Sequence, residues 1–280
     1  MSQVTGRKWP RVLMFIVLLC FAAFVLFPII VVTMNSFKSK LFISNEPFKF
    51  PNKTTFVGMT NYTSGIAKTG FIRAFGYSLW ITVASVLGIL LITSMLAWYI
   101  TRVKDTVTTF IYYSLVFSMI VPFQMVMFTM TKFANMLHLD NPIGIILLYV
   151  GFGAGMASFI FAGFIKSVPI ALEEAAMIDG CNPVQTFFLI VMPMLKSTAI
   201  TIAILNTMWV WNDYLLPYLT IGNDYKTIPV AVQYLRGGYG SVDMGAMMAM
   251  LVLAMIPVIV FFLSCQKYII KGVLAGAVKG

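Results

Sequence analysis

Long apolar runs separated by polar stretches dominate the pattern along the chain. Each run is about 20 residues or longer, the length that an α-helix needs to cross a hydrocarbon core of ~30 Å. Because a backbone in lipid has to satisfy its own hydrogen bonds, runs of this length predict helices. The pattern therefore predicts an all-α membrane protein, one transmembrane domain over residues 1–280, with six spans at approximately residues 12–34, 75–100, 110–131, 142–165, 198–219 and 244–268.

The segments between the runs predict the orientation. Residues 12–34 follow basic residues but are too long for a cleaved signal peptide, so they are expected to remain as the first span. In the short turn 101–108, Arg102 and Lys104 outnumber Asp105, which favours a cytoplasmic position. With six spans, both termini are then cytoplasmic. The polar stretch 35–70 is the longest outer loop, and its prolines, including Pro47 and Pro51, favour turns over a continuous helix.

Composition narrows the class of protein. The chain is 60% hydrophobic and 10% charged, with a mean hydropathy of +0.92, which excludes an ordinary soluble domain. Its net charge of +10 comes from residues at span ends and in loops, so it indicates anchoring in the membrane rather than nucleic-acid binding. The three cysteines, Cys20, Cys181 and Cys265, have no spacing typical of disulfides or metal sites.

The same sequence argues against an enzyme. The one histidine, His138, excludes His-rich metal sites and a Ser-His-Asp triad, and no GxxxxGK[ST] phosphate-binding loop is present. We therefore expect no catalytic residue, metal or cofactor on this chain. The spans contain almost no ionisable side chains, with Asp213 as the main exception, so proton or sodium coupling is not expected. Energy for transport would have to enter from another subunit.

The polar segment 167–197 is predicted to form two short helices joined by a break. Ser167 is expected to cap the first helix, with Pro169 in its first turn and Gly180 as its stop signal. Asn182 and Pro183 repeat the start signal for the second helix.

The second helix of this segment carries an amphipathic pattern. Val184, Phe187, Phe188 and Val191 follow the i, i+3, i+4, i+7 spacing of one buried face. Pro193 is expected to kink this helix or to return the chain to the membrane.

The first helix of the segment is acidic. Glu173, Glu174 and Asp179 are balanced only by Lys196, and the small Ala175–Ala176 pair allows another surface to approach closely. Carboxylates on a short helix invite charge-assisted bonds from a partner's Arg or Lys. The helix is therefore interpreted as a docking site for a soluble protein, and an ordinary polar loop on the membrane surface remains the alternative.

Polar and aromatic residues gather in the fifth predicted span. Aromatic faces beside amide and carboxylate groups suit the binding of sugar rings and hydroxyls, so these residues are the candidates for a polar path. An interfacial aromatic belt with helix–helix hydrogen bonds is the alternative. The candidates are Asn206, Trp209, Trp211, Asn212, Asp213 and Tyr214.

The acidic helix also carries a motif. Glu174-Ala175-Ala176, three residues, Gly180, nine residues and then Ile190-Val191-Met192-Pro193 resembles the EAA signature of membrane subunits of bacterial ABC importers. Met192 stands where the family usually has Leu, an apolar replacement of similar volume. Three further stretches resemble the carbohydrate-uptake branch, in particular the second permease of maltose-type transporters: Trp211-Asn212-Asp213 with Pro217, Thr227-Ile228-Pro229-Val230 with Tyr239-Gly240, and the ending at residues 271–280.

The resemblance implies an assembly in the bacterial plasma membrane. This chain would form half of the pore of a di- or oligosaccharide importer, paired with a homologous second permease. An ABC ATPase dimer would bind ATP and Mg²⁺, and an extracytoplasmic binding protein would deliver the sugar. The coupling-helix loop would dock on the ATPase, with Glu174 forming a salt bridge and Gly180 making the turn; its residues are Glu173, Glu174, Ala175, Ala176, Asp179 and Gly180.

By the same resemblance, the outer loop 221–243 would contact the binding protein. The contacting residues would be Tyr234, Arg236, Gly237, Gly238, Tyr239 and Gly240.

Two alternative functions remain open at this stage. One is an ABC permease for another solute, such as an amino acid, phosphate or peptide, and the other is a membrane scaffold that conducts nothing.

Overall fold

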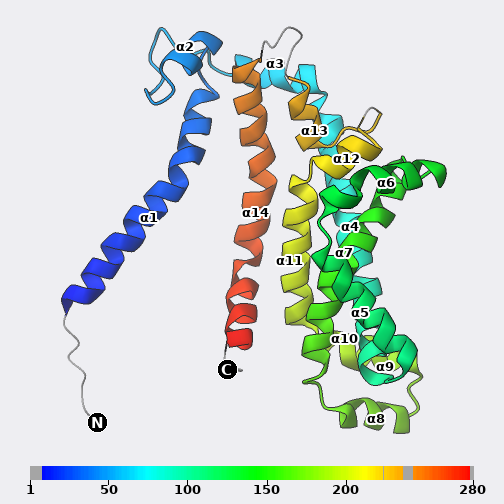
Figure 1. Cartoon of the computed structure of the whole chain (residues 1–280). Helices are drawn as coiled ribbons and strands as arrows, with labels where there is room; N and C mark the ends of the chain where they lie inside the picture. The colour runs from blue at the N-terminus through cyan, green and yellow to red at the C-terminus, as the bar shows by residue number, and fades with distance from the viewer. Residues whose placement is uncertain (1–7, 223, 236–241, 278–280) are drawn as a thin grey trace. The chain divides into compact units, whose positions relative to one another are not determined.

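The computed structural model describes residues 8–222, 224–235 and 242–277, which are mainly helical (Figure 1). In these ranges no strand forms, and the only β-type pairing is an isolated antiparallel bridge between Lys38 and Phe56. The predicted all-α class is therefore confirmed. The helices are α1 (Lys8–Asn35), α2 (Lys40–Asn45), α3 (Thr60–Thr69), α4 (Phe71–Arg102), α5 (Thr106–Ile120), α6 (Phe123–Met136), α7 (Pro142–Ile165), α8 (Ile170–Ile178), α9 (Pro183–Thr186), the π-helix η1 (Phe187–Val191), α10 (Met192–Met194), α11 (Lys196–Asn212), α12 (Leu215–Thr220), α13 (Ile228–Gln233) and α14 (Met244–Ala277).

Several helices are long and apolar enough to cross a membrane. Over the described residues they are Val12–Asn35, Phe71–Arg102, Pro142–Ile165 and Met244–Lys267. Two bent helix pairs pass the same test when each is counted as one span: Thr106–Ile120 with Phe123–Met136, and Pro183–Met194 with Lys196–Asn212. The chain is therefore a multi-pass membrane protein with four to six candidate spans.

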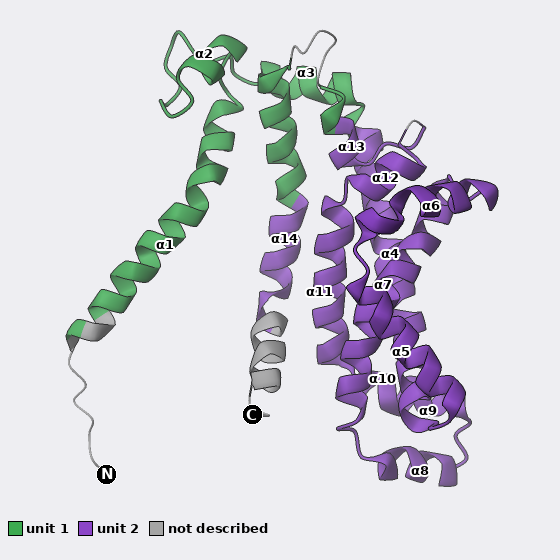
Figure 2. Cartoon of the chain, viewed as in Figure 1, with its two compact units in different colours: residues 1–71, 232–256 green, residues 72–231, 257–280 purple. Residues whose placement is uncertain are grey.

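The chain divides into two compact units, shown in Figure 2. Residues 1–71 and 232–256 form the first unit, and residues 72–231 and 257–280 form the second. Helix α14 contributes its beginning to the first unit and its later part to the second.

Polar contacts hold the first unit together. The Asn61 side-chain amide donates to the carbonyls of Ser36 and Lys38, both at 2.8 Å. The buried Lys38 ammonium donates to the Glu46 carbonyl at 2.9 Å. An ion pair joins Lys68 of α3 to Asp243, the residue before α14, at 2.5 Å. These bonds fix the loop after α1, α2, α3 and the start of α14 to one another.

The second unit has two apolar cores along α7. One contains Phe161 and Ile165 near the end of α7, with residues of α4, η1 and α11. The other contains Ile145 and Tyr149 near its beginning, with residues of α4, α11 and α12. Figure 1 shows α8 at one end of this unit, beyond the end of α7, and α6 and α12 near the other end. The two candidate sites predicted from the sequence therefore lie toward opposite ends of α7.

Helix α5 packs closely against α7 at a glycine. A Cβ atom at Gly155 would lie 2.6 Å from the Leu115 carbonyl oxygen and 2.7 Å from the Ser118 hydroxyl. Side-chain movement cannot relieve a clash with a backbone oxygen. This contact is therefore possible only because residue 155 has no side chain.

Replacing Gly155 with valine is expected to lower the stability of the folded chain by about 1–3 kcal/mol, the usual cost of overpacking a tight core. Gly151, one turn earlier on the same helix, provides the control, because a Cβ atom there would meet nothing within 4 Å. Thermal unfolding of both variants in detergent measures the difference. Equal unfolding temperatures for G155V and G151V would show that the α5–α7 contact does not limit stability.

The third predicted span, residues 110–131, is not one helix. α5 ends at Ile120 and α6 begins at Phe123, with a bend of 110° between them. Pro122 lacks an N–H group and forces the residue before it out of the helical region, and Val121 is extended with ψ 113°. The segment predicted as the third span therefore consists of two helices joined by a bend at Pro122.

The fifth predicted span, residues 198–219, is also interrupted. α11 ends at Asn212, Asp213 is extended with ψ 126°, and α12 begins at Leu215. The Asp213 carboxylate accepts a hydrogen bond from the Leu215 N–H at 3.0 Å, so the aspartate stabilises the first turn of α12. Its side chain competes with the continuous helix that the apolar pattern predicts.

Two details of segment 167–197 also differ from the prediction. Ser167 does not cap α8, since its hydroxyl donates to the Phe164 carbonyl and Pro169 occupies the N-cap position. In the second helix Phe187 and Val191 are buried, whereas Val184 and Phe188 are exposed. The π-helical turn η1 changes the α-helical spacing on which that predicted face depended.

Candidate functional site

Helix α8 is short because its sequence contains its own stop signal. Gly180 adopts φ +90°, a left-handed conformation that side chains other than glycine rarely adopt. The Cys181 N–H then bonds back to the Ala176 carbonyl at 2.9 Å, which closes the helix end. Asn182 begins the next helix with a reciprocal capping box to Gln185. The predicted break at Gly180 and the predicted start at Asn182 are confirmed.

A buried ion pair fixes α8 to the last turn of α4. Glu173 is 3% exposed, and its Oε1 atom lies 2.6 Å from Nη2 of Arg102. Nε of Arg102 also donates to this carboxylate, at 3.0 Å, and the Trp98 indole N–H donates to Oε2 at 2.9 Å. The Arg102 guanidinium further donates to the Val168 carbonyl just before α8. Every oxygen of the Glu173 carboxylate is thus engaged within the chain.

The other predicted docking residues lie on different sides of α8. Ala176 is buried with Glu173, whereas Glu174, Ala175, Asp179 and Gly180 are exposed. Within the described parts of the chain, the carboxylates of Glu174 and Asp179 have no ion-pair partner. Helix α8 therefore has one side anchored to the unit and one side open, with Ile178 86% exposed on it.

Trp98 also contacts the segment that follows α8. Its ring lies 5.6 Å from that of Phe187 in η1, while its N–H bonds to Glu173 in α8. One side chain of α4 therefore holds both halves of the 167–197 segment. This role of Trp98 and Arg102 was not predicted from the sequence, because the positive charge at the end of the second span was interpreted as a signal for orientation alone. A sequence signal for this contact was Arg102 at the end of the second span together with the acidic pair Glu173-Glu174 in the loop that follows the fourth span.

Toward the other end of α7, a second polar contact surrounds Asp213. The Tyr149 hydroxyl donates to Oδ2 of Asp213 at 2.9 Å, and the tyrosine ring meets Trp209 edge-on at 5.4 Å. Tyr149 is fully buried in α7 and was not predicted as a site residue. Its presence in an otherwise apolar span was the available signal, because a buried phenol requires a hydrogen-bond partner.

The remaining residues of the predicted polar path do not join this contact. Asn206 is fully buried and donates to the Ile202 carbonyl at 2.9 Å. Asn212 is exposed, and Tyr214 stacks on Tyr218. Trp211 is buried, meets Phe75 edge-on at 5.9 Å and lines an apolar pocket of about 290 Å³. The structure thus brings Trp209 and Asp213 together and places the other members elsewhere.

Most of the predicted binding-protein loop lies outside the described residues. This applies to Arg236, Gly237, Gly238, Tyr239 and Gly240. Tyr234 is described and is 47% exposed.

Over the described residues, no group of three His, Cys, Asp or Glu side chains is arranged to hold a metal ion.

Several apolar helices, two bent helix pairs and a short acidic helix fixed by a buried ion pair are consistent with a membrane permease. The chain belongs to the family of binding-protein-dependent transport system inner membrane components, whose model matches residues 89–274. It is therefore a membrane subunit of a transport system and not an enzyme. The resemblance to ABC importer permeases predicted from its motifs is confirmed.

Curated relatives align over most of the chain. The chain is 35% identical, over 90% of its length and 91% of the relative's, to the probable starch degradation products transport system permease protein AmyC of Thermoanaerobacterium thermosulfurigenes. It is 36% identical to the multiple sugar-binding transport system permease protein MsmG of Streptococcus mutans, over 91% of this chain and 92% of the relative.

A solved structure supports the fold. It is a chain of a bacterial ABC transporter involved in the import of the acidic polysaccharide alginate. The TM-score is 0.77 with 20% sequence identity, and the match covers 95% of this chain and 99% of that one.

Proposed function

We propose that this chain is the permease subunit of an ATP-driven sugar importer and forms one half of its translocation pore. The observation that carries the solute class is that the relatives named for starch products and multiple sugars align over about nine-tenths of both chains. Di- and oligosaccharides are the proposed cargo. A path for such solutes needs polar and aromatic side chains within the membrane. The exposed Trp209 and the Asp213 carboxylate, which the buried Tyr149 holds in place, are the proposed contributors.

The proposed topology has six spans in one transmembrane domain, with each bent helix pair counted as one span. An even number of spans puts both termini on the same side, and the basic turn after α4 favours the cytoplasm for that side. The proposed location is the plasma membrane of a bacterium. The family is named for its dependence on a binding protein, so an extracytoplasmic sugar-binding protein is one proposed partner. A homologous second permease, which would form the other half of the pore, is the proposed partner within the membrane.

We further propose that α8 is the coupling helix on which an ABC ATPase docks. The division of α8 into an anchored and an open side supports this role. Glu174, Ala175, Asp179 and Gly180 on the open side are available to a partner, and Glu173 and Ala176 transmit its movement to the unit. ATP and Mg²⁺ bind to the ATPase pair and not to this chain. The energy of hydrolysis enters the permease as a displacement of α8.

The test is capture of the tagged chain in mild detergent, followed by reconstitution of everything retained into liposomes. A second permease and an ABC ATPase should be retained, and the liposomes should accumulate labelled di- or trisaccharides only with ATP and binding protein. Recovery of the chain without other subunits would favour a non-conducting scaffold. ATP-dependent uptake of amino acids, phosphate or peptides without sugar uptake would favour a permease for that solute.

A further inference from the structure

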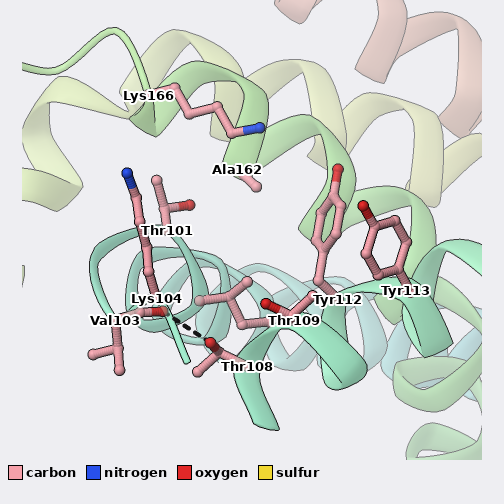
Figure 3. Close-up of a pocket in the computed structure, with 10 residues that line it drawn as sticks. Thr101, Val103, Lys104, Thr108, Thr109, Tyr112, Tyr113, Ala162 and Lys166 are labelled. Carbon is pink, nitrogen blue, oxygen red and sulfur yellow. Dashed lines mark hydrogen bonds between the residues drawn. The ribbon is translucent and has the colours of Figure 1, made fainter. Parts of the chain in front are cut away.

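A second pocket in the larger unit takes no part in the anchor of α8 or in the Asp213 contact. It has a volume of about 240 Å³ and opens between the end of α4, the start of α5 and the end of α7 (Figure 3). Its walls carry two lysines, two tyrosines and three threonines. The polar lining residues are Thr101, Lys104, Thr108, Thr109, Tyr112, Tyr113 and Lys166.

The side chains that line this pocket carry two positive charges and no negative charge. In Figure 3, Lys104 rises beside Thr101, and Lys166 extends from the end of α7 toward Tyr112. The Lys166 Nζ atom lies 5.9 Å from the centre of the Tyr112 ring. Among the described residues, neither ammonium group has a carboxylate partner. A pocket with two such cations favours an anionic ligand.

The charged groups next to the pocket are already engaged. The Asp105 carboxylate accepts a hydrogen bond from the Thr108 N–H at 2.7 Å and caps α5. The Arg102 guanidinium is held by Glu173. Among the described residues, Asp105 forms no ion pair with either lysine, and the charge of Arg102 is paired with that of Glu173.

The exposed side of α5 leads away from the pocket and is apolar. Phe110, Tyr113, Phe117 and Ile120 recur at three- and four-residue spacing, which places them on one face, and all four are more than 60% exposed. Tyr113 belongs both to this face and to the pocket. A ligand with an anionic head and apolar chains fits this combination, because its head meets the lysines while its chains cover the α5 face.

We propose that this pocket binds the phosphate group of an anionic membrane phospholipid. Lys104 and Lys166 act as its counter-ions, the phenol groups of Tyr112 and Tyr113 supply hydrogen-bond donors, and the acyl chains lie along α5. The site is independent of the solute that the transporter carries. Lipid binding there would make the conformation of the turn between α4 and α5 depend on the phospholipid composition of the surrounding leaflet.

The test uses the assembled transporter in nanodiscs of phosphatidylcholine with and without phosphatidylglycerol, and native mass spectrometry counts the bound lipids. Loss of one lysine near a membrane surface weakens anionic-lipid binding roughly fivefold, and loss of both roughly 25-fold. The double variant K104Q/K166Q should therefore retain much less phosphatidylglycerol and unchanged phosphatidylcholine. K196Q is the control, because Lys196 is exposed at the start of α11 and does not line the pocket.

A conservative variant separates ligand binding from folding. K104R/K166R keeps both charges and should retain phosphatidylglycerol even if the glutamine variant is poorly folded. Equal phosphatidylglycerol binding by the folded glutamine variant and the parent would overturn the proposal. So would displacement of the lipid by inorganic phosphate alone, which would mean that the pocket takes a soluble anion. Unchanged lipid binding with loss of the ATPase would assign the lysines to a protein contact instead.

Discussion

Reversing the charge of one exposed carboxylate, in the variant Glu174→Lys, is expected to abolish ATP-driven sugar uptake while the chain still inserts and folds. Glu174 lies on the open side of α8 and has no ion-pair partner within the described chain, so the change removes no internal contact. At the proposed ATPase interface it replaces an attraction with a repulsion. Loss of such a charge pair weakens association by about 2 kcal/mol or more, which is roughly 30-fold.

The measurement compares ATPase co-purification, ATP hydrolysis and sugar uptake for the variant and its parent. Asp140→Lys is the matched control, because it makes the same charge change on an exposed residue before the opposite end of α7. The control should transport normally. Normal uptake by E174K would remove Glu174 from the docking surface, whereas failure of E174K to insert would mean that the residue has a structural role.

Breaking the buried ion pair is expected to have the largest effect on stability. In Glu173→Ala, the Arg102 guanidinium loses its counter-ion while its side chain is only 18% exposed. An unpaired buried charge costs about 3–5 kcal/mol. The variant should unfold at a markedly lower temperature and should lose sugar-stimulated ATP hydrolysis at the same time.

A double variant distinguishes stability from coupling. Arg102→Met with Glu173→Met replaces both charges by apolar side chains, and such replacements of buried ion pairs are often neutral or stabilising. The folded state should therefore recover most of its unfolding temperature. Hydrolysis should remain uncoupled from transport, because the directional bonds from Arg102 and Trp98 that hold α8 are gone. Full coupling in this variant would show that apolar packing alone carries the movement.

Local signals predicted much of the fold. The apolar run 142–165 predicted α7 with its observed bounds, and in the structure the Asn141 side chain caps its start by accepting from the N–H groups of Ile143 and Gly144. Gly180 and Asn182 likewise define the ends of the two helices that flank the predicted break. Caps and glycine turns depend on neighbouring residues, so one sequence is sufficient to find them.

The contacts that build the candidate sites were not predictable in this way. Arg102 and Glu173 are 71 positions apart, and Tyr149 and Asp213 are 64 positions apart. No periodicity connects residues at such separations. Pro122 was visible in the sequence, but the bend was not. An apolar run that continues on both sides of a proline does not reveal whether the helix kinks or ends there.

The arrangement of α8 has a consequence for how transporters of this kind diversify. The side chains that hold α8 in place, Glu173 and Ala176, lie on a different face of the helix from the exposed Glu174 and Ala175. Substitutions on the open face can therefore accumulate without disturbing the fold beneath it. If α8 docks an ATPase as proposed, its docking surface can therefore change while the Arg102–Glu173 anchor beneath it stays the same.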